Sequence, residues 1–495
     1  MSFAPPFFTL PRTGLRMAAA TALGLLLSAC AALDPGGRKP ELPAVPTAAP
    51  RTTGSDTPAA TEHRRLVTLF GGEYRSSAAE LYLNGILARL ARTPDSKGDA
   101  YRVTILNTQA VNAFALPSGN LYVTRGLLAL ANDSAEIAAV MAHEIAHVTA
   151  RHANQRAELE KNAQVISRAA SLIQSREKGE EVQASGRRSL ASFSRQQELE
   201  ADQIGVRMIA AAGYDPYGAA RFLTSLGRSA NLRAALFGQR GQEEQPDILA
   251  THPSTPERVR QALAAARQHG APGIGAGGRE EYFNAIDGID FGDDPNEGFV
   301  RGRSFIHPKL GFSFTAPEGF VLENSTQALL GLAAGGAQAL RLDNVKLPAT
   351  TSLETYLGSG WIEGIDASSI RATSLNGIQA ALGRARGGEW HFRVAVMRFG
   401  ADVYRLIFAT RNLSPAMDAR FIESIESFRP LETEDAQRVR PLRIRIVTAS
   451  AGDTPATLAQ RMAVSEKPVE QFLLLNGLEP GAVLRPEERY KIVVE

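Results

Sequence analysis

The sequence predicts an α+β protein of several domains, because its secondary-structure signals change along the chain. Apolar residues at helical spacing dominate the first half, whereas alternating strand patterns dominate the part after residue 303. A length of 495 residues suits two to four domains. We expect a signal segment, a tether, a mainly helical domain with a small sheet, a linker, an α+β sandwich-like domain, a second linker and a small β-α-α-β domain; in that order the ranges are 1–29, 30–63, 64–270, 271–302, 303–432, 433–444 and 445–495.

The N-terminal segment has the pattern of a bacterial lipoprotein signal. Arg12 and Arg16 precede an apolar run, residues 17–27, that is too short for a confident membrane span and ends in Leu27-Ser-Ala-Cys30. This tetrapeptide resembles a bacterial lipoprotein processing site, where the cysteine thiol is lipidated and the cysteine becomes the mature N-terminus. Cys30 is the only cysteine, so it cannot form an internal disulfide. An ordinary cleaved signal with an incidental cysteine is the alternative.

A lipid on Cys30 would anchor the chain without spanning the bilayer. Residue 31 is alanine and not the aspartate linked to inner-membrane retention, so we expect the periplasmic side of a bacterial envelope, with the outer membrane favoured. Six prolines in residues 31–62 predict an extended tether. The formal net charge of +2 falls to about zero without Arg12 and Arg16 (2 − 2 = 0), which gives no electrostatic case for nucleic acid.

The next domain opens with a predicted helix over residues 64–92 and strands over 101–107 and 121–124. The helix that follows is the strongest signal in the chain. It begins with the spacing of a capping box at Asp133 and Glu136, and its apolar residues recur at helical spacing.

This helix carries the segment His143-Glu-Ile-Ala-His147. The two histidines are four residues apart on one face, where both imidazoles can hold one Zn²⁺. Glu144 would lie beside the open coordination position, where a carboxylate can take a proton from water and pass it to a leaving amine. The alternative is a helix whose histidines satisfy buried polar groups.

A third metal ligand is expected from a second helix, predicted over residues 193–212. Glu198 and Asp202 share one face of it, so Glu198 can bind the metal while Asp202 accepts a hydrogen bond from the outer nitrogen of a ligating histidine. Glu200 points elsewhere and is the second choice for the ligand. An acidic helix face alone is usually only solvated, so this interpretation depends on the preceding motif.

Three segments together carry a family resemblance: His143-Glu-Ile-Ala-His147, Glu198-Leu-Glu-Ala-Asp202-Gln-Ile-Gly205 and Val111-Asn-Ala-Phe-Ala-Leu-Pro-Ser-Gly-Asn-Leu-Tyr-Val-Thr-Arg-Gly-Leu-Leu128. They resemble the membrane-associated zinc metallopeptidases of the gluzincin group, which include the CAAX prenyl, HtpX-like and BepA-like proteases. The resemblance covers residues 64–268 and implies one zinc per chain, two His ligands and one Glu ligand, endopeptidase activity and, in the bacterial secreted branch, envelope protein quality control. Gln203 departs from the arginine common in the family.

The resemblance also assigns roles to two other segments. It places Ala113, Phe114 and Ala115 along the substrate edge, where backbone hydrogen bonds would hold an extended peptide. A plain hairpin is the alternative there. It places His252 near the metal, where it would stabilise the oxyanion or occupy the open zinc position and keep the enzyme latent; a structural histidine is the alternative. Ser254 has the spacing that would open the next helix, which we expect to run to residue 268.

Residues 153–192 between the two metal helices are polar. We favour a mobile flap over the site, and a surface pair of helices is the alternative.

The domain over 303–432 is predicted to contain strands followed by helices, without an acid-base pair or a metal cluster. It resembles, faintly, the photosystem-P and nuclear-transport-factor sandwich, and we interpret it as an interaction module. The strands are expected at 311–315, 339–342, 379–383, 390–399 and 403–408, and the helices at 353–360 and 415–427.

The last 50 residues resemble a lysin-motif module, which implies binding of peptidoglycan or chitin. Pro455 and residues 485–488 depart from the usual pattern, so the resemblance supports the fold more than the sugar binding. With a lipid at the other end, the chain would bridge membrane and cell wall.

These observations predict a zinc metalloendopeptidase of the envelope, with protein substrates, a lipid membrane anchor and peptidoglycan as a further partner. A non-catalytic assembly or chaperone factor on a protease scaffold is one alternative. A zinc amidase acting on peptidoglycan is the other.

Overall fold

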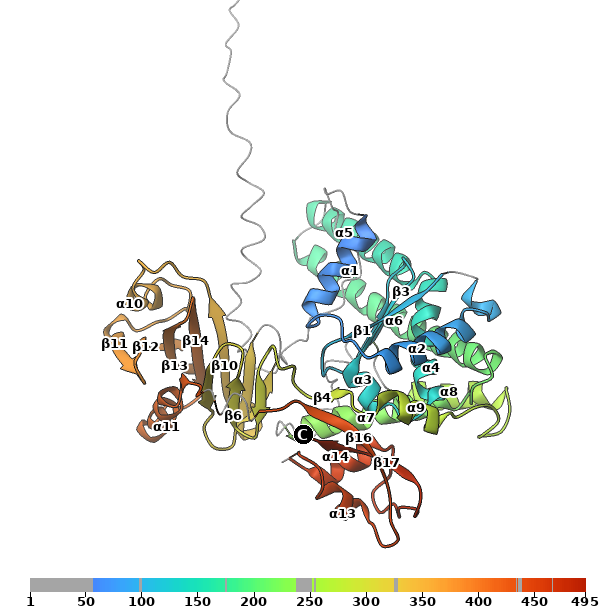
Figure 1. The fold of residues 1–495 in the computed structure, drawn as a ribbon. Helices are drawn as coiled ribbons and strands as arrows, with labels where there is room; N and C mark the ends of the chain where they lie inside the picture. The colour runs from blue at the N-terminus through green and yellow to red at the C-terminus, as the bar shows by residue number, and fades with distance from the viewer. Residues whose placement is uncertain are drawn as a thin grey trace, which may run out of the picture.

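The computed structural model shows three bodies: a helical domain, a sheet domain to its left and a C-terminal module below it (Figure 1). The predicted signal, Cys30 and most of the tether lie outside the part of the chain that the structure describes. For residues 163–173 and 176–193 the structure describes the backbone only. The described residues are 57–97, 100–173, 176–236, 252, 255–324, 328–432, 434, 439–464 and 466–495.

Within the described residues, the helical domain contains nine α-helices packed around a small sheet of order β1-β3-β2. The prediction of one helix over residues 64–92 is wrong. The chain turns at Gly71 and Gly72, with φ of 79° and 98°, so this segment forms two separate helices. The elements are α1 (Pro58–Leu69), α2 (Ser77–Leu90), β1 (Arg102–Leu106), β2 (Ala113–Ala115), β3 (Asn120–Thr124), α3 (Arg125–Leu130), α4 (Ser134–Thr149), α5 (His152–Ile173), α6 (Arg176–Ala211), α7 (Gly218–Leu236), α8 (Pro256–Arg267) and α9 (Arg279–Ile286).

Helix α4 lies at the centre of this domain, and most of its residues are buried. Its many alanines let neighbouring helices approach closely. A Cβ atom on Gly218 of α7 would lie 2.5 Å from the Ala135 backbone, and one on Gly205 of α6 would lie 3.3 Å from the His143 nitrogen. Helices α6 and α7 therefore press directly against α4, and α6 does so beside His143.

The predicted start of α4 is confirmed in its main feature. Asp133 is the N-cap, and its carboxylate accepts a hydrogen bond from the Glu136 backbone at 2.8 Å. The Glu136 carboxylate reaches one residue further back than a capping box requires, because it accepts from the Asn132 nitrogen at 2.9 Å.

The polar stretch at 153–192 forms α5 and the first half of α6, which pack against each other. The structure thus shows the alternative, a pair of helices, in place of the favoured flap. Of the helices in the described part of the chain, none is long and apolar enough to cross a membrane.

The sheet domain consists of a seven-stranded sheet of order β11-β12-β13-β14-β10-β9-β8 and a four-stranded sheet of order β15-β7-β6-β5. The small sheet and α11 cover one face of the large sheet, and α10 covers the other. The predicted strands and helices are present. Their bounds are β5 (Phe299–Arg301), β6 (Ser304–His307), β7 (Phe312–Thr315), β8 (Val321–Asn324), β9 (Leu329–Ala333), β10 (Gln338–Val345), α10 (Leu353–Leu357), β11 (Arg371–Leu375), β12 (Ile378–Gly387), β13 (Trp390–Phe399), β14 (Asp402–Thr410), α11 (Pro415–Glu426) and β15 (Arg429–Pro430).

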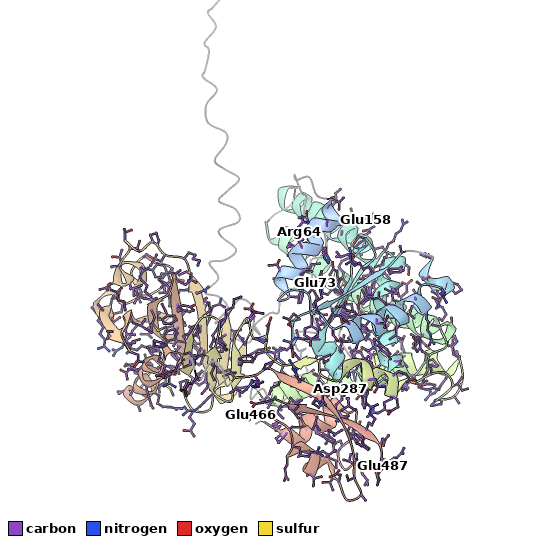
Figure 2. The ribbon with its side chains drawn as sticks, in the orientation of Figure 1. Arg64, Glu73, Glu158, Asp287, Glu466 and Glu487 are labelled. Carbon is purple, nitrogen blue, oxygen red and sulfur yellow. The ribbon has the colours of Figure 1, made fainter. Side chains whose placement is uncertain are left out.

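The C-terminal module has the predicted order strand, helix, helix, strand. It comprises β16 (Leu442–Thr448), α13 (Pro455–Ala459), α14 (Pro468–Leu475) and β17 (Arg489–Val494). Strands β16 and β17 are antiparallel, and β4 (Asp290–Phe291) extends their sheet. Figure 2 labels Asp287 at this junction, where its carboxylate accepts from the Ile446 nitrogen at 3.0 Å.

The prediction of a linker over residues 271–302 is therefore wrong. That segment contains α9, whose Tyr282 and Phe283 are fully buried, and the strand β4. Its apolar residues belong to one hydrophobic core that also contains residues of the C-terminal module, such as Phe472 and Tyr490.

Candidate metal centre

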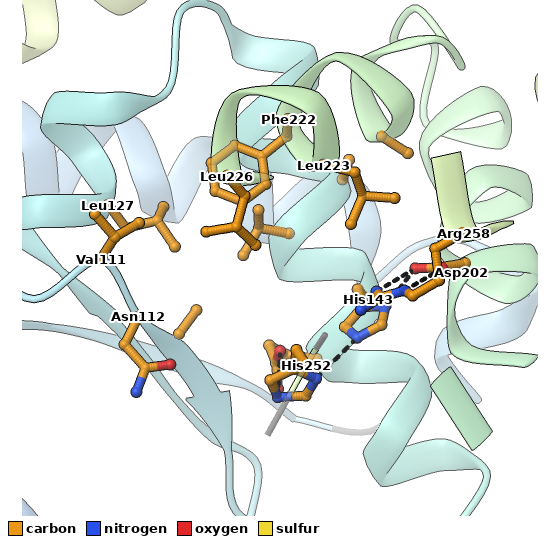
Figure 3. A pocket seen from close by; sticks show the side chains of 15 residues that line it. Val111, Asn112, Leu127, His143, Asp202, Phe222, Leu223, Leu226, His252 and Arg258 are labelled. Carbon is orange, nitrogen blue, oxygen red and sulfur yellow. Dashed lines mark hydrogen bonds and ion pairs between the residues drawn. The ribbon is translucent and has the colours of Figure 1, made fainter. Parts of the chain in front are cut away.

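Four side chains from three parts of the helical domain converge on one point. Figure 3 labels two of them, His143 and His252, which also line a cavity. Helix α4 supplies His143 and His147, α6 supplies Glu198, and His252 precedes α8. One ligand atom from each lies within 4.8 Å of all the others. Sequence reasoning had identified all four residues, and the structure brings them together.

The distances fit a tetrahedral metal site. The Nε2 atoms of His143 and His147 are 3.0 Å apart, and His252 Nδ1 lies 3.2 Å from His143 Nε2. Ligands about 2.0–2.1 Å from Zn²⁺ in tetrahedral geometry are about 3.3 Å from one another. Glu198 completes the set, with Oε1 at 3.4 Å from His147 Nε2 and Oε2 at 3.0 Å from His252 Nδ1.

Two further observations indicate a cation. Glu198 Oε1 is buried and has no hydrogen-bond partner, although it faces the histidines. Burial lowers the pKa of His143, but the carboxylates of Asp202 and Glu198 outweigh it and raise the pKa to about 10. Positive charge is thus favoured at this point. Three imidazoles and one carboxylate form a set of nitrogen and oxygen donors that fits Zn²⁺.

Glu144 lies beside the cluster with a buried carboxylate, and its Oε1 is 3.6 Å from His252 Nε2. Burial raises the pKa of Glu144 above its ordinary value. A carboxylate that holds a proton more readily suits a general base.

Asp202 lies where its predicted role, as partner of the outer nitrogen of a ligating histidine, requires it, since its Oδ1 is 3.0 Å from His143 Nδ1. Sequence reasoning missed its partner Arg258, whose Nε and Nη2 each donate to the Asp202 carboxylate at 2.7 Å. Arg258 Nη1 also lies 2.9 Å from Glu198 Oε2. Burial raises the pKa of Asp202, but Arg258 outweighs it, so the pKa is lowered and the carboxylate stays charged. An arginine in the first turn of α8 was the only signal in the sequence.

Glu200, the second choice for the ligand, does not reach the cluster. Its side chain is 59% exposed, and its Oε2 lies 3.4 Å from His152 Nε2. The sequence assigned no role to His152. In the structure His152 is buried, and its Nδ1 lies 2.9 Å from His147 Nδ1.

A cavity of ≈ 70 Å³ opens beside His143 and Glu144. Figure 3 shows Leu127, Phe222 and Leu226 lining it on the side away from Arg258, with Leu223 between them and Arg258. The lining next to the candidate metal site is therefore largely apolar.

Strand β2 lies at the edge of the small sheet and contains the predicted substrate-binding residues. The Asn112 carbonyl accepts a hydrogen bond from the Thr124 nitrogen, and the Leu116 nitrogen donates to the Asn120 carbonyl. Because hydrogen-bonded pairs alternate along an antiparallel ladder, the N–H and C=O groups of Ala113 and Ala115 point away from β3. Ala113 also lines the cavity. The Phe114 ring instead packs with Phe70 and Tyr122 in a separate core cluster, and the backbone groups of Phe114 face β3, so Phe114 itself directs no group to the free edge.

The helical domain is similar to known proteases. Residues 77–266 match the profile of peptidase family M48. The chain is 30% identical over 197 residues to the beta-barrel assembly-enhancing protease of Escherichia coli (strain K12), which covers 38% of this chain and 39% of that protein. It is 34% identical over 168 residues to the mitochondrial metalloendopeptidase OMA1 of Arabidopsis thaliana, covering 34% of this chain and 32% of that protein.

The chain thus spans less than two thirds of the length of these relatives. A crystal structure from Bacteroides thetaiotaomicron VPI-5482 shares 13% sequence identity with a TM-score of 0.22, over 33% of this chain and 58% of that one. This last likeness is too slight to carry an inference.

Proposed function

We propose that the protein is a zinc metalloendopeptidase of peptidase family M48 that cleaves proteins of the bacterial envelope, because residues 77–266 match the profile of that family. The observation that carries the proposal is the convergence of His143, His147 and Glu198 on one point, with Glu144 beside them. These three ligands would hold one zinc ion per chain.

Bound zinc would supply a Lewis acid that polarises the scissile carbonyl and makes a water molecule more acidic. Glu144 takes a proton from the attacking water and delivers it to the nitrogen of the leaving amine. Asp202 Oδ1, which lies 3.0 Å from His143 Nδ1, would hold the ring proton of His143 on Nδ1 and leave His143 Nε2 free to ligate. Arg258 keeps the Asp202 carboxylate charged and in place.

His252 would keep the enzyme latent. Its Nδ1 lies close to both His143 Nε2 and Glu198 Oε2, so it is suited to the fourth coordination position that water and substrate need. On this proposal His252→Ala retains zinc and gains activity. A variant that retains zinc but loses activity would assign the oxyanion role to His252, and loss of stoichiometric zinc would make it a ligand required for binding or a structural support.

The substrate would bind as an extended strand along β2. The backbone groups of Ala113 and Ala115 offer a free edge among the described residues, which favours backbone recognition over side-chain sequence. The apolar cavity beside Glu144 would accept an apolar side chain next to the scissile bond. Exposed segments of misassembled proteins offer both features.

The envelope location rests on the sequence and on one relative. The lipoprotein box at Cys30 favours a lipid anchor in the outer membrane, and one similar protein is named for enhancing β-barrel assembly. Quality control of envelope proteins is the role that combines these observations. The lysin-motif resemblance of the C-terminal module adds peptidoglycan as a partner, and failure of the protein to pellet with peptidoglycan would contradict that part.

Product analysis tests the proposal. The purified protein is incubated with casein and, separately, with peptidoglycan, and the products are identified by mass spectrometry. Internal cleavage of casein supports the endopeptidase. Release of cross-link peptides from peptidoglycan alone would favour the zinc amidase, and zinc binding without either product, in the wild type and in His252→Ala, would favour a non-catalytic assembly factor.

A further inference from the structure

His152 lies next to the metal cluster without belonging to it. It is the first residue of α5, directly after the end of α4, and only 2% of it is exposed. On a continuous helix, residues five apart point about 140° away from each other. Arg151, in the left-handed conformation with φ of 56°, interrupts the helix and turns His152 back toward His147.

The two rings meet through their Nδ1 atoms, which are 2.9 Å apart. His147 Nε2 faces the metal ligands, so in the ligating form it carries a lone pair and the proton of the neutral ring is on Nδ1. That proton is donated to His152 Nδ1, which accepts with its own lone pair. His152 must then carry its proton on Nε2, which lies 3.4 Å from Glu200 Oε2.

The position of His152 is itself fixed from α6. Gln197 is buried, and its Nε2 donates to the His152 carbonyl at 3.1 Å. Gln197 directly precedes the ligand Glu198 in the chain, so one helix supplies a metal ligand and also fixes the residue that contacts His147. Asp202, on the same helix, contacts Nδ1 of His143, just as His152 contacts Nδ1 of His147. Each histidine ligand of α4 thus has one partner at its outer nitrogen.

We propose that His152 is a positioning residue that orients the His147 ring and selects the tautomer in which Nε2 ligates zinc. The inference rests on the zinc site of the proposed function and extends it. Partners of this kind typically contribute a factor of about 10 to 100 in metal affinity.

Two substitutions separate this role from simple packing. His152→Asn keeps an acceptor near the position of Nδ1, whereas His152→Leu fills the space without one. Zinc affinity is measured by competition with a chromophoric chelator, and the absorption bands of the Co²⁺-loaded protein report ligand geometry. We expect His152→Leu to bind zinc about 10 to 100 times more weakly, with altered Co²⁺ bands, and His152→Asn to stay close to the wild type.

Glu158→Gln provides the matched control, because this residue is exposed on the same helix as His152 and is expected to change zinc affinity little. Wild-type affinity in His152→Leu would overturn the proposal, and so would an equal loss in His152→Asn and His152→Leu. If the leucine variant does not fold, His152→Ala makes the same comparison. Zinc affinity is measured without substrate, so a protein that binds zinc but cleaves nothing would overturn the proposed function and not this inference.

Discussion

The sheet domain and the C-terminal module both lie beside the helical domain, but they are attached in different ways. The hydrophobic clusters of the sheet domain contain only its own residues. Its contacts with the helical domain include the ion pair of Arg233 with Glu323 and the hydrogen bond of Gln109 to the Asn324 carbonyl. The C-terminal module instead shares one continuous core with the helical domain.

A buried lysine strengthens the second attachment. Lys491 of β17 is fully buried, and its Nζ donates to the carbonyls of Ala129 and Ala131 at 2.7 and 2.6 Å. These carbonyls lie at the end of α3, immediately before the segment that starts α4. Position in the sequence therefore does not decide which part packs into the helical domain: the module farthest along the chain shares its core, and the domain before it has cores of its own.

Removal of each region should have opposite effects. Truncation before Leu442 exposes the shared core. Each large apolar side chain that loses its burial costs about 1.5–3 kcal/mol, so the loss over several of them is comparable with a typical stability of about 5–15 kcal/mol. We expect the truncated chain to lose cooperative helical unfolding in circular dichroism. Excision of residues 303–438 should leave the helical fold and casein cleavage intact, because Arg301 donates to the Arg440 carbonyl at 2.6 Å and the two ends are adjacent. A stable helical domain after the truncation, or its unfolding after the excision, would contradict this difference in attachment.

Single substitutions sharpen the same contrast. Lys491→Met leaves buried carbonyls without a partner and should lower the free energy of unfolding of the helical domain by about 2 kcal/mol. Arg233→Met removes a partly exposed ion pair and should change stability by less than about 1 kcal/mol. Both tryptophans, Trp361 and Trp390, lie in the sheet domain, so denaturant unfolding followed by circular dichroism and by tryptophan fluorescence separates the two transitions. A shift of the fluorescence transition by Lys491→Met would contradict independent attachment.

The pH dependence of the sheet domain gives a smaller effect. Burial, with a contribution from Lys309, lowers the pKa of His307 from 6.5 to about 4. The unfolded chain therefore binds a proton that the folded domain does not, and the domain loses stability as pH falls from about 6.5 toward 4. At pH 5 the loss should be about 1–2 kcal/mol in the fluorescence transition. His307→Asn should remove this contribution, and an unchanged pH profile in that variant would contradict the assignment.

What could be predicted from the sequence depends on how local the determining contacts are. The metal helix and Glu198 follow from residue spacing within single helices. His152 could not be placed, because its contact with His147 depends on the left-handed turn at Arg151. Arg258 reaches Asp202 only through the packing of α8 on α6. Helix α9 has only eight residues and lies among glycines, so its buried face resembled a linker.

In the proposed mechanism, Glu144 would act with a bound zinc ion to hydrolyse peptide bonds. The most direct test measures zinc content and casein cleavage in the wild type and in Glu144→Gln, each also in the His252→Ala background. We predict about one zinc per chain in the wild type and in Glu144→Gln, and cleavage only by proteins that retain Glu144. Cleavage by Glu144→Gln, or zinc binding without cleavage by any of the four proteins, would contradict the account.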